Sequence, residues 1–376
     1  MSSVEVNNLP KGWEDKKWDE ILEIKNGKSQ KEFLVDEGGY PIYGSGGVMS
    51  GRVSKFLCPK NTTIIGRKGT IDKPYYIEEE FWNVDTAFGL CSKTGLNPRF
   101  LYYFCLIFNF QSLNKSTTLP SLTKRDLLQI RMPIPPLEEQ KRIVAKIDTL
   151  FAKIDKAISL TEESLKQAQN LFTSSLSQKF DDLKQLYKSF PLMKYVDFIG
   201  GSQPPKSSFS YEFKEGFIRL IQIRDYKTDN HIVYIHQDST KKLCEADDVM
   251  IGRYGPPVFQ ILRGIKGAYN VALMKAIPNE SMVSKDFLFY FLQNSSIQNY
   301  IISISQRSAG QSGVNKKALE AYSIVLPPLD VQSKYVGIFN QLQSSSEETQ
   351  SKLKEQLAYL KQLKSSILSK AFKGEL

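Results

Sequence analysis

The chain has 376 residues, with 50 Lys and Arg against 40 Asp and Glu, so its formal net charge is +10. Hydrophobic residues at 41% and charged residues at 24% are typical of a globular protein and exclude extended disorder. At about 150 residues per domain the length predicts two domains. The positive charge permits a polyanionic partner, whereas two histidines argue against a histidine-rich metal centre.

The four cysteines show no CxxC spacing, which argues against a zinc ribbon or a redox dithiol. A reduced, cytoplasmic setting is therefore expected. The first residues, MSSVEVNNLPKGW, lack the basic-then-apolar pattern of a signal peptide. The most apolar run, Phe100 to Phe110, is about half of the ~20 residues that span a bilayer, so we expect a buried helix and no membrane association.

The sequence repeats itself over a long period. IPPLEEQKRI begins at Ile134 and LPPLDVQSKY at Leu326, and at the same offset LFTSSLSQKF ends at Phe180 and LKSSILSKAF at Phe372. Further pairs of similar strings keep the same order and begin at Ile64 and Met250, Trp82 and Tyr269, Phe100 and Phe287, and Leu122 and Val314. Residues 28–60 and 202–245 hardly resemble each other. The pattern indicates a duplicated unit whose end is shared and whose start differs.

Each unit opens with short apolar runs separated by Gly, Pro, Asp and Ser, which predicts strands and turns. One helix is expected over 98–110 in the first unit and over 285–302 in the second. Thr123 and Asn315 have the residue types and positions of N-caps for a short helix that follows. Prolines at 133, 135 and 136, and at 327 and 328, then end regular structure.

After these prolines each unit continues into a long helix with one apolar stripe. The residues expected in the stripe are Ile147, Leu150, Ile154 and Leu165 in the first helix, and Leu353, Leu357, Leu360 and Ile367 in the second. Each helix would reach ~70 Å at 1.5 Å per residue, and a helix of this length with one stripe needs a partner. The SSSEETQ stretch is expected to weaken the stripe at its middle.

Chain topology predicts that the two helices pair as an antiparallel coiled coil. The expected fold is α+β: globular α/β units at 1–136 and 188–328, and helices at 137–187 and 329–376, with an internal pseudo-twofold repeat. The alternative is that each helix folds back on its own domain.

Sequence motifs of catalysis are absent. HExxH, GxSxG, the kinase signature and the Asn-Pro-Pro-Tyr type of motif of adenine methyltransferases do not occur. GSGGVMSGR lacks the Lys-Ser/Thr of a phosphate-binding loop. His231 and His236 are expected on the surface or in loops. The prediction is therefore a chain with no catalytic residues and no bound metal.

Arg, Lys, Tyr, Asn and Gln recur in the Gly-rich segments of both units, and these residue types suit base edges and phosphates. The candidate DNA contacts of the first unit are Arg67, Lys68, Thr70, Lys73, Lys124 and Arg125. Those of the second unit are Arg219, Gln222, Arg224, Tyr226, Arg253, Tyr254, Gln260, Arg263, Tyr269, Asn270, Lys316 and Lys317. Arg67 and Arg253 are the strongest candidates, because the Ile-Gly-Arg motif returns in both units.

Several long strings resemble the specificity subunit of type I restriction-modification systems. They are the opening LPKGW, the PPLEEQ before a long helix, the ending SSILSKAFKGEL, and the strings GSQPPKSSFSYEFKEGFIRLIQIRDYK and DDVMIGRYGPPVFQILRGIKGAYNVALMK. The last two look like one target recognition domain of this family. The resemblance covers essentially the whole chain.

The resemblance implies that each globular unit reads one half of a bipartite, asymmetric DNA site. The coiled coil would set the half-site spacing and dock two modification subunits, and two restriction subunits would complete the complex. S-adenosylmethionine, ATP and Mg²⁺ would act in those other subunits, so this chain would bind no cofactor and catalyse nothing. Two alternatives remain: the specificity subunit of a related type II system that cuts on both sides of its site, and a coiled-coil scaffold that binds no DNA.

Overall fold

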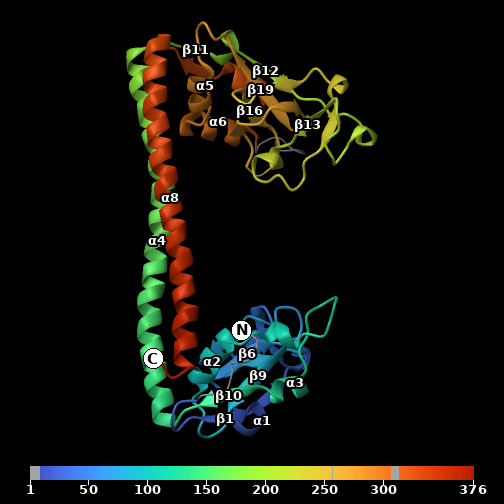
Figure 1. Cartoon of the computed structure of the whole chain (residues 1–376), viewed down its shortest axis with the longest axis vertical. Coiled ribbons are helices and arrows are strands. Elements are labelled where there is room, and N and C mark those ends of the chain that lie inside the picture. Colours follow the sequence, from blue (N-terminus) through green and yellow to red (C-terminus); the bar gives the residue numbers. More distant parts are fainter. Residues whose placement is uncertain (1–8, 256, 306–312) are drawn as a thin grey trace. The chain divides into compact units, whose positions relative to one another are not determined.

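The computed structural model describes residues 9–255, 257–305 and 313–376, and the chain forms two compact units. Unit 1 comprises Met1–Glu162 and Glu355–Leu376, and unit 2 comprises Glu163–Lys354. In Figure 1 the blue N-terminal part and the red C-terminal end of the chain both belong to unit 1. Each unit thus contains part of both long helices. The assignment of 1–136 and 188–328 as recognition domains stays a prediction.

Unit 1 consists of short strands with helices packed against them. Its strands are β1 (Glu14–Lys17), β2 (Leu22–Asn26), β3 (Leu34–Val35), β4 (Tyr40–Gly44), β5 (Gly47–Val53), β6 (Thr62–Gly66), β7 (Tyr75–Ile77), β8 (Trp82–Asn83), β9 (Ala87–Ser92) and β10 (Arg131–Ile134). Its helices are α1 (Trp18–Ile21), α2 (Pro98–Ile107), α3 (Lys124–Leu128), the first part of α4 (Leu137–Leu186), the last part of α8 (Leu329–Ala371), and the 3-10 turns η1 (Lys31–Phe33) and η2 (Phe110–Leu113). The sheets have the orders β2-β9-β6-β7, β3-β5-β4-β8 and β1-β10.

Unit 2 repeats this plan. Its strands are β11 (Ser189–Pro191), β12 (Val196–Gly200), β13 (Phe217–Ile221), β14 (Tyr234–His236), β15 (Leu243–Cys244), β16 (Val249–Gly252), β17 (Gln260–Leu262), β18 (Gly267–Tyr269), β19 (Leu273–Pro278) and β20 (Ser323–Val325). Its helices are the last part of α4, α5 (Lys285–Leu292), α6 (Ser295–Ser305), α7 (Lys316–Ala321), the first part of α8 (Leu329–Ala371), and the 3-10 turns η3 (Leu192–Lys194), η4 (Lys206–Ser208), η5 (Ile223–Tyr226) and η6 (Gln237–Ser239). The sheets have the orders β12-β19-β16-β17, β14-β13-β18-β15 and β11-β20.

The two units share one sheet and differ in the other. The antiparallel order β2-β9-β6-β7 in unit 1 equals β12-β19-β16-β17 in unit 2. Both second sheets contain one parallel pair, β4 with β8 and β13 with β18. Their fourth strands differ, because β3 pairs with β5 whereas β15 pairs with β18. The predicted duplication is confirmed, and the units diverge where the sequence does.

The helices α4 and α8 lie side by side and antiparallel within each unit (Figure 1). In unit 1, Lys364 of α8 forms an ion pair with Asp155 of α4. In unit 2 the rings of Phe339 of α8 and Phe180 of α4 stack at 5.1 Å. Residue numbers along α8 therefore decrease in the direction in which those along α4 increase, as expected for antiparallel helices. Helix α4 is unbroken over 50 residues, and the alternative that each helix folds back on its own domain is wrong.

The predicted stripe is well buried at its ends and thinner at its middle. Ile147, Leu150, Ile154, Leu360 and Ile367 belong to or pack against the core of unit 1. Leu165, Leu353 and Leu357 are only half-buried. The SSSEETQ stretch does not interrupt α8. Within it, the Ser346 hydroxyl donates to the Ala168 carbonyl of α4 at 3.3 Å.

A buried glutamine fixes the start of each long helix. The Gln140 side-chain amide donates to the carbonyls of Gly95 and Pro135 at 2.9 and 2.8 Å, and its oxygen accepts from the Asn97 N–H at 2.8 Å. Gln332 repeats the arrangement in unit 2. It donates to the carbonyls of Met282 and Pro327 at 2.7 and 2.9 Å and accepts from the Ser284 N–H at 2.9 Å. Because Asn97 and Ser284 are the N-caps of α2 and α5, each glutamine links the long helix to the aromatic helix beneath it.

The aromatic helices α2 and α5 are each covered by the end of a long helix. Phe372 packs against Phe100 and Phe104 of α2, with ring centroids 4.7 and 5.5 Å apart. Phe180 packs against Phe287 and Phe291 of α5 at 5.4 and 5.5 Å. The shared endings of the two repeats are therefore equivalent core contacts, one in each unit.

The expected single helix over 285–302 is wrong, since α5 ends at Leu292 and α6 begins at Ser295. The break occurs at Asn294, which is buried. Its side-chain oxygen accepts the Ser296 N–H at 2.9 Å, and this local hydrogen bond replaces the helical one. Both predicted N-caps are confirmed, because Thr123 accepts from the Asp126 N–H and Asn315 from the Ala318 N–H.

Within the described ranges, no helix combines the length and the apolar character that crossing a membrane requires.

The buried glutamine gives a prediction about stability. Gln332→Leu leaves the Ser284 N–H and two carbonyls without their partner, so we expect a loss of about 1–3 kcal/mol of unfolding free energy. Chemical denaturation monitored by circular dichroism measures it. Gln356→Leu, at an exposed position of the same helix, is the matched control. Equal denaturation midpoints for the two variants would contradict the role of Gln332.

Candidate nucleic-acid interface

The predicted Gly-Arg motif of unit 1 forms a turn at the end of β6. A Cβ on Gly66 would lie 1.9 Å from the Thr70 carbonyl oxygen, so only glycine allows this turn. The Arg67 N–H donates to the Thr86 carbonyl at 2.7 Å, and the Arg67 carbonyl accepts from the Leu122 N–H at 2.9 Å. Through these bonds the turn joins the loop that precedes α3, which begins with Lys124 and Arg125.

Unit 2 has the same arrangement at the end of β16. The Arg253 N–H donates to the Ala272 carbonyl at 2.8 Å, and the Arg253 carbonyl accepts from the Val314 N–H at 3.0 Å. Lys68 forms a β-bridge with Ser121 in unit 1, and Tyr254 forms one with Gly313 in unit 2. The folded chain thus joins each Gly-Arg turn to a short helix with a basic start, which lies far along the sequence.

The basic side chains at the turn of unit 1 differ in how far they are exposed and in their contacts with the rest of the protein. Arg67 is half-buried, with its guanidinium 5.7 Å from the Phe88 ring. Lys124 donates to the Ile24 carbonyl at 2.7 Å, which gives it a structural role. Arg125 is exposed, 3.9 Å from Asp126. The remaining candidates of this unit are also exposed: Lys68, Thr70 and Lys73.

In unit 2, the Arg253 guanidinium lies 5.1 Å from the Tyr254 ring and donates to the Val271 carbonyl at 3.2 Å. The ring and the backbone bond hold the arginine in place, and the Tyr254 side chain is exposed. Lys316 pairs with Glu320 at 3.4 Å, and Lys317 is exposed. Tyr254, Lys316 and Lys317 are thus exposed on the surface of unit 2.

Other predicted contacts of unit 2 serve the fold. Arg263 pairs with Asp286 at 2.6 Å and lies 3.9 Å from the Phe289 ring, and Arg219 pairs with Asp229 at 2.9 Å and with Asp225 at 3.6 Å. Gln222 is the N-cap residue of η5, and its backbone N–H donates to the Asp225 carboxylate at 3.1 Å. The Gln260 side-chain amide donates to the Pro257 carbonyl at 3.0 Å.

Three further predicted contacts lie inside unit 2. Tyr269 is buried, and burial raises its pKa to about 12. Tyr226 has a buried hydroxyl without a hydrogen bond, and burial raises its pKa too. Asn270 is buried and accepts from the Ala272 N–H at 3.1 Å. The burial of Tyr269, of Asn270 and of the Tyr226 hydroxyl leaves these groups little access to a base.

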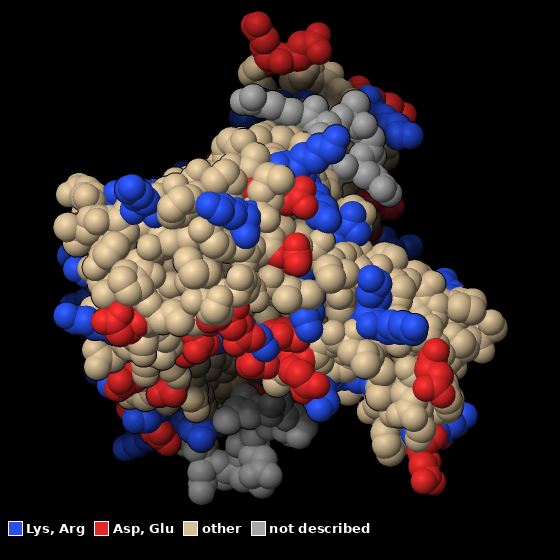
Figure 2. All heavy atoms as spheres, turned by 90° about the horizontal axis from the view of Figure 1, so that it is seen from above, with Lys and Arg blue, Asp and Glu red and all other residues tan. Residues whose placement is uncertain are grey.

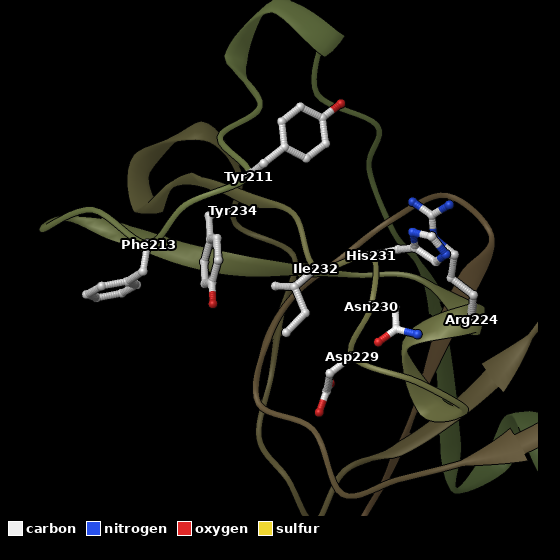
Figure 3. A pocket seen from close by; sticks show the side chains of 8 residues that line it. All are labelled: Tyr211, Phe213, Arg224, Asp229, Asn230, His231, Ile232 and Tyr234. Atoms are coloured by element: carbon white, nitrogen blue, oxygen red, sulfur yellow. The ribbon is translucent and has the colours of Figure 1, made fainter.

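A surface hollow that the sequence did not indicate lies in the same unit. It measures about 600 Å³ and combines aromatic side chains with polar ones (Figure 3). Of the predicted contacts only Arg224 lines it, together with Tyr211, Phe213 and His231. Aromatic residues at alternate positions of the charged stretch YEFKEG were the available signal.

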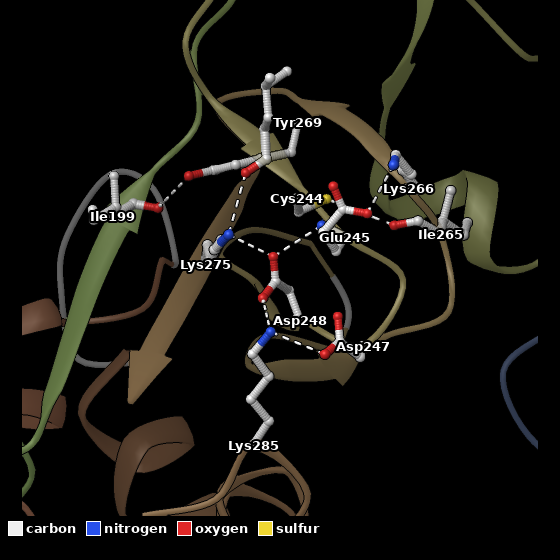
Figure 4. A network of polar contacts seen from close by, with 11 residues as sticks. Ile199, Cys244, Glu245, Asp247, Asp248, Ile265, Lys266, Tyr269, Lys275 and Lys285 are labelled. Carbon is white, nitrogen blue, oxygen red and sulfur yellow. Dashed lines mark hydrogen bonds and ion pairs between the residues drawn. The ribbon is translucent and has the colours of Figure 1, made fainter. Parts of the chain in front are cut away.

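A buried carboxylate holds the start of β16, the strand that ends directly before Arg253 (Figure 4). Asp248, directly before β16, accepts from Lys275 of β19, from Lys285 of α5 at 2.9 Å, and from the Glu245 N–H at 2.9 Å. Burial opposes the charge of Asp248, but the two lysines outweigh it, so its pKa lies below the ordinary value. The hydrogen bond to Asp248 is also the main cause that raises the pKa of Lys285.

On the face drawn in Figure 2, lysine and arginine side chains are interspersed with aspartate and glutamate. The positively charged side chains on this face therefore do not form one continuous patch. A DNA contact has to be identified residue by residue and does not follow from the net charge alone.

Two stretches of the chain, residues 10–167 and 196–359, match the family of the type I restriction modification DNA specificity domain. The chain belongs to this family. The two matches cover the two copies of the repeat, so each half is a specificity domain in its own right. The resemblance noted in the sequence is thereby confirmed.

Several curated specificity subunits are similar to this family member. The type I restriction enzyme EcoBI specificity subunit from Escherichia coli is 24% identical over 95% of this chain and 85% of its own length. The putative MjaX specificity subunit from Methanocaldococcus jannaschii is 23% identical over 88% of this chain and 87% of its own. The EcoKI specificity subunit from Escherichia coli (strain K12) is 23% identical over 70% of this chain. That match spans 62% of the EcoKI subunit, less than two thirds of its length.

Solved structures share the fold of this specificity-domain protein. A chain from a study of complex assembly and conformational transition of the type I R-M system superposes with a TM-score of 0.80. It covers 98% of this chain and 100% of that chain at 20% identity. The HsdS subunit from Thermoanaerobacter tengcongensis gives a TM-score of 0.57 at 23% identity, over 99% of both chains. The predicted α+β fold with two long helices is confirmed.

The Asp248 network gives a pH prediction. The pKa of Asp248 is lower in the folded chain than the unfolded value of about 3.9, so its contribution to stability is complete above that value. It is lost as the pH falls through the folded pKa. We therefore expect Asp248→Asn to cost on the order of 3 kcal/mol at pH 7 and progressively less below about pH 4.

Denaturation midpoints of the native chain and of this variant, measured from pH 7 to pH 3, test the prediction. Asp247→Asn is the control, since Asp247 is exposed and pairs with Lys285 alone. A difference between Asp248→Asn and the native chain that stays constant down to pH 3 would contradict it.

Proposed function

We propose that this chain is the DNA-reading, non-catalytic subunit of a type I restriction-modification enzyme, and that each unit reads one half of a bipartite, asymmetric site. The observation that carries the proposal is the Gly-Arg turn, which occurs once in each unit. The Arg67 carbonyl accepts from the Leu122 N–H in unit 1, and the Arg253 carbonyl accepts from the Val314 N–H in unit 2. Membership of the specificity-domain family supports it.

The two turns have the same pattern of backbone hydrogen bonds but carry different side chains. Unit 1 has Arg67 followed by Lys68, and unit 2 has Arg253 followed by Tyr254. Short helices with different basic pairs follow in each unit. Phosphate contacts position a protein on DNA, whereas arginine reads guanine through two hydrogen bonds. An equal scaffold with different side chains suits two half-sites of different sequence.

We further propose that the paired helices set the half-site spacing and dock two modification subunits. Leu137 and Leu329 occupy the same position of the two PPL motifs, and both are exposed, at 40% and 44%. Exposed apolar side chains at equivalent positions suit two copies of one partner. Two restriction subunits would complete the complex.

Catalysis and cofactors belong, in this proposal, to the other subunits. S-adenosylmethionine would serve the modification subunits, and ATP and Mg²⁺ the restriction subunits. The Asn-Pro-Pro-Tyr type of motif of adenine methyltransferases does not occur in this sequence. A cytoplasmic location accords with the four cysteines, all of which are free.

The alternatives are favoured less. The curated relatives are named as type I specificity subunits, which argues against the related type II system. A protein that contacts DNA phosphates loses affinity for DNA steeply as the salt concentration rises. A scaffold that binds only protein would not bind DNA in this salt-dependent way.

Replacement of the turn arginines tests the reading of half-sites. In the assembled complex, Arg253→Ala should relax sequence preference in one half-site and Arg67→Ala in the other. Each should cost about 1–3 kcal/mol if the arginine contacts a base. Binding to DNA libraries with one randomised half-site measures the preference.

The control for this test is Lys241→Ala, an exposed cation of unit 2 outside the turn. If either arginine variant weakens binding equally on all sequences, the arginine contacts phosphate. If the unaltered complex selects no sequence, the proposed function fails.

Lengthening the helices tests the spacing. One heptad inserted after Ser164 in α4 and a matching heptad after Lys354 in α8 would extend the pair by about 10 Å at 1.5 Å per residue. We expect the preferred spacer to grow by about three base pairs, each 3.4 Å along a strand. Methylated-adenine sequencing of host DNA reads out the site, and an unchanged spacer with intact methylation would refute the spacing role.

A further inference from the structure

Two neighbouring aromatic side chains of unit 2 are largely exposed. Tyr211 is 78% and Phe213 69% exposed, in the segment between η4 and β13. Neither belongs to a core cluster of the described part of unit 2. Phe213 meets the Tyr234 ring edge-on at 5.6 Å. Large apolar side chains that gather on a surface mark a binding site, because their exposure to water is unfavourable.

These rings form one wall of the hollow of about 600 Å³. Figure 3 shows Phe213 and Tyr234 on one side of it, and Arg224 with His231 on the other. Asn230 and Asp229 also line the hollow. It therefore offers aromatic faces and hydrogen-bonding groups to the same ligand.

The backbone under both walls is held in place. Ser210 and Tyr234 exchange two backbone hydrogen bonds, at 2.9 and 2.8 Å, which attach the Tyr211 segment to β14. Arg219 of β13 pairs with Asp229 at 2.9 Å and holds the opposite wall. A site whose backbone is fixed before binding loses less entropy when it binds.

The free groups of the hollow suit the edges of DNA bases. Within the residues that the structure describes, the side chains of Arg224, Asn230 and His231 form no hydrogen bond or ion pair with the protein. Arginine reads guanine, asparagine reads adenine, and apolar side chains contact the thymine methyl group. Asp229 also lines the hollow, and a carboxylate can accept a hydrogen bond from the amino group of cytosine.

The hollow lies where the two units differ. It falls within residues 202–245, which hardly resemble 28–60 of unit 1. Tyr234 belongs to the sheet whose strand order is not shared between the units. The sheet that both units share cannot distinguish two half-sites of different sequence. The segments that differ between the units are therefore the better candidates for residues that determine the sequence of each half-site.

We propose that this hollow contacts base edges of double-stranded DNA and determines part of the specificity for one half-site. The proposal rests on the proposed function, because it requires unit 2 to read a half-site. Tyr211, Phe213 and Arg224 are the specificity-determining residues that it adds.

The test is selection from a library of duplexes by the assembled complex, with and without Tyr211→Ala/Phe213→Ala. We expect the preference at one or more positions of a single half-site to fall at least tenfold, with the other half-site unchanged. Met193→Ala, another exposed apolar residue of unit 2, is the control and should leave all preferences intact.

A second pair of variants keeps the test decisive if the double variant proves unstable by thermal denaturation. Arg224→Ala should relax the same half-site, and Lys241→Ala, which removes an equal charge outside the hollow, should not.

Unchanged preferences in the folded variants would overturn the proposal, and so would an equal loss of affinity on every sequence, which would indicate phosphate contact. Both outcomes leave the proposed function standing so long as the unaltered complex selects a bipartite site. Failure of the unaltered complex to select any site would remove the proposed function itself.

Discussion

The burial of one phenylalanine from the end of a long helix completes each globular unit. Phe180 covers α5 in unit 2, and Phe372 covers α2 in unit 1. Loss of a buried phenylalanine side chain costs about 3–5 kcal/mol, a large part of the stability of a domain. Since Phe372 ends the second repeat but packs in the first unit, α8 must run back along α4. The antiparallel pairing follows from this packing and from the stripe between the helices.

The buried glutamines and the aromatic contacts explain why the ends of the repeats are alike. Gln140 and Gln332 each satisfy an N-cap N–H and two carbonyls that would otherwise be buried without partners. The shared PPLxxQ motif therefore has an internal structural role besides any contact with partner subunits. Its leucine is exposed in both copies, which leaves that position available to another chain.

Much of the fold could be predicted from the sequence, and less of the site. Long helices with an apolar stripe and side-chain N-caps at Thr123 and Asn315 are local patterns, and both are observed. The break at Asn294 was missed, because it depends on one side chain replacing a helical bond. Arg263 looks like a DNA contact in the sequence, yet its partner Asp286 lies 23 residues away and neutralises it. Residue type alone does not reveal such partners.

The sequence by itself determined the duplication, the positions of the long helices and the family, because these are written in residue order and in helical periodicity. The tertiary structure decided which polar residues are available. Burial removes Tyr269 and Asn270 from the surface, and ion pairs occupy Arg219 and Arg263. It also brought Tyr211 and Phe213 beside Arg224 in one hollow. Exposure and pairing depend on contacts between residues that are distant along the chain, and for this reason only the folded chain shows them.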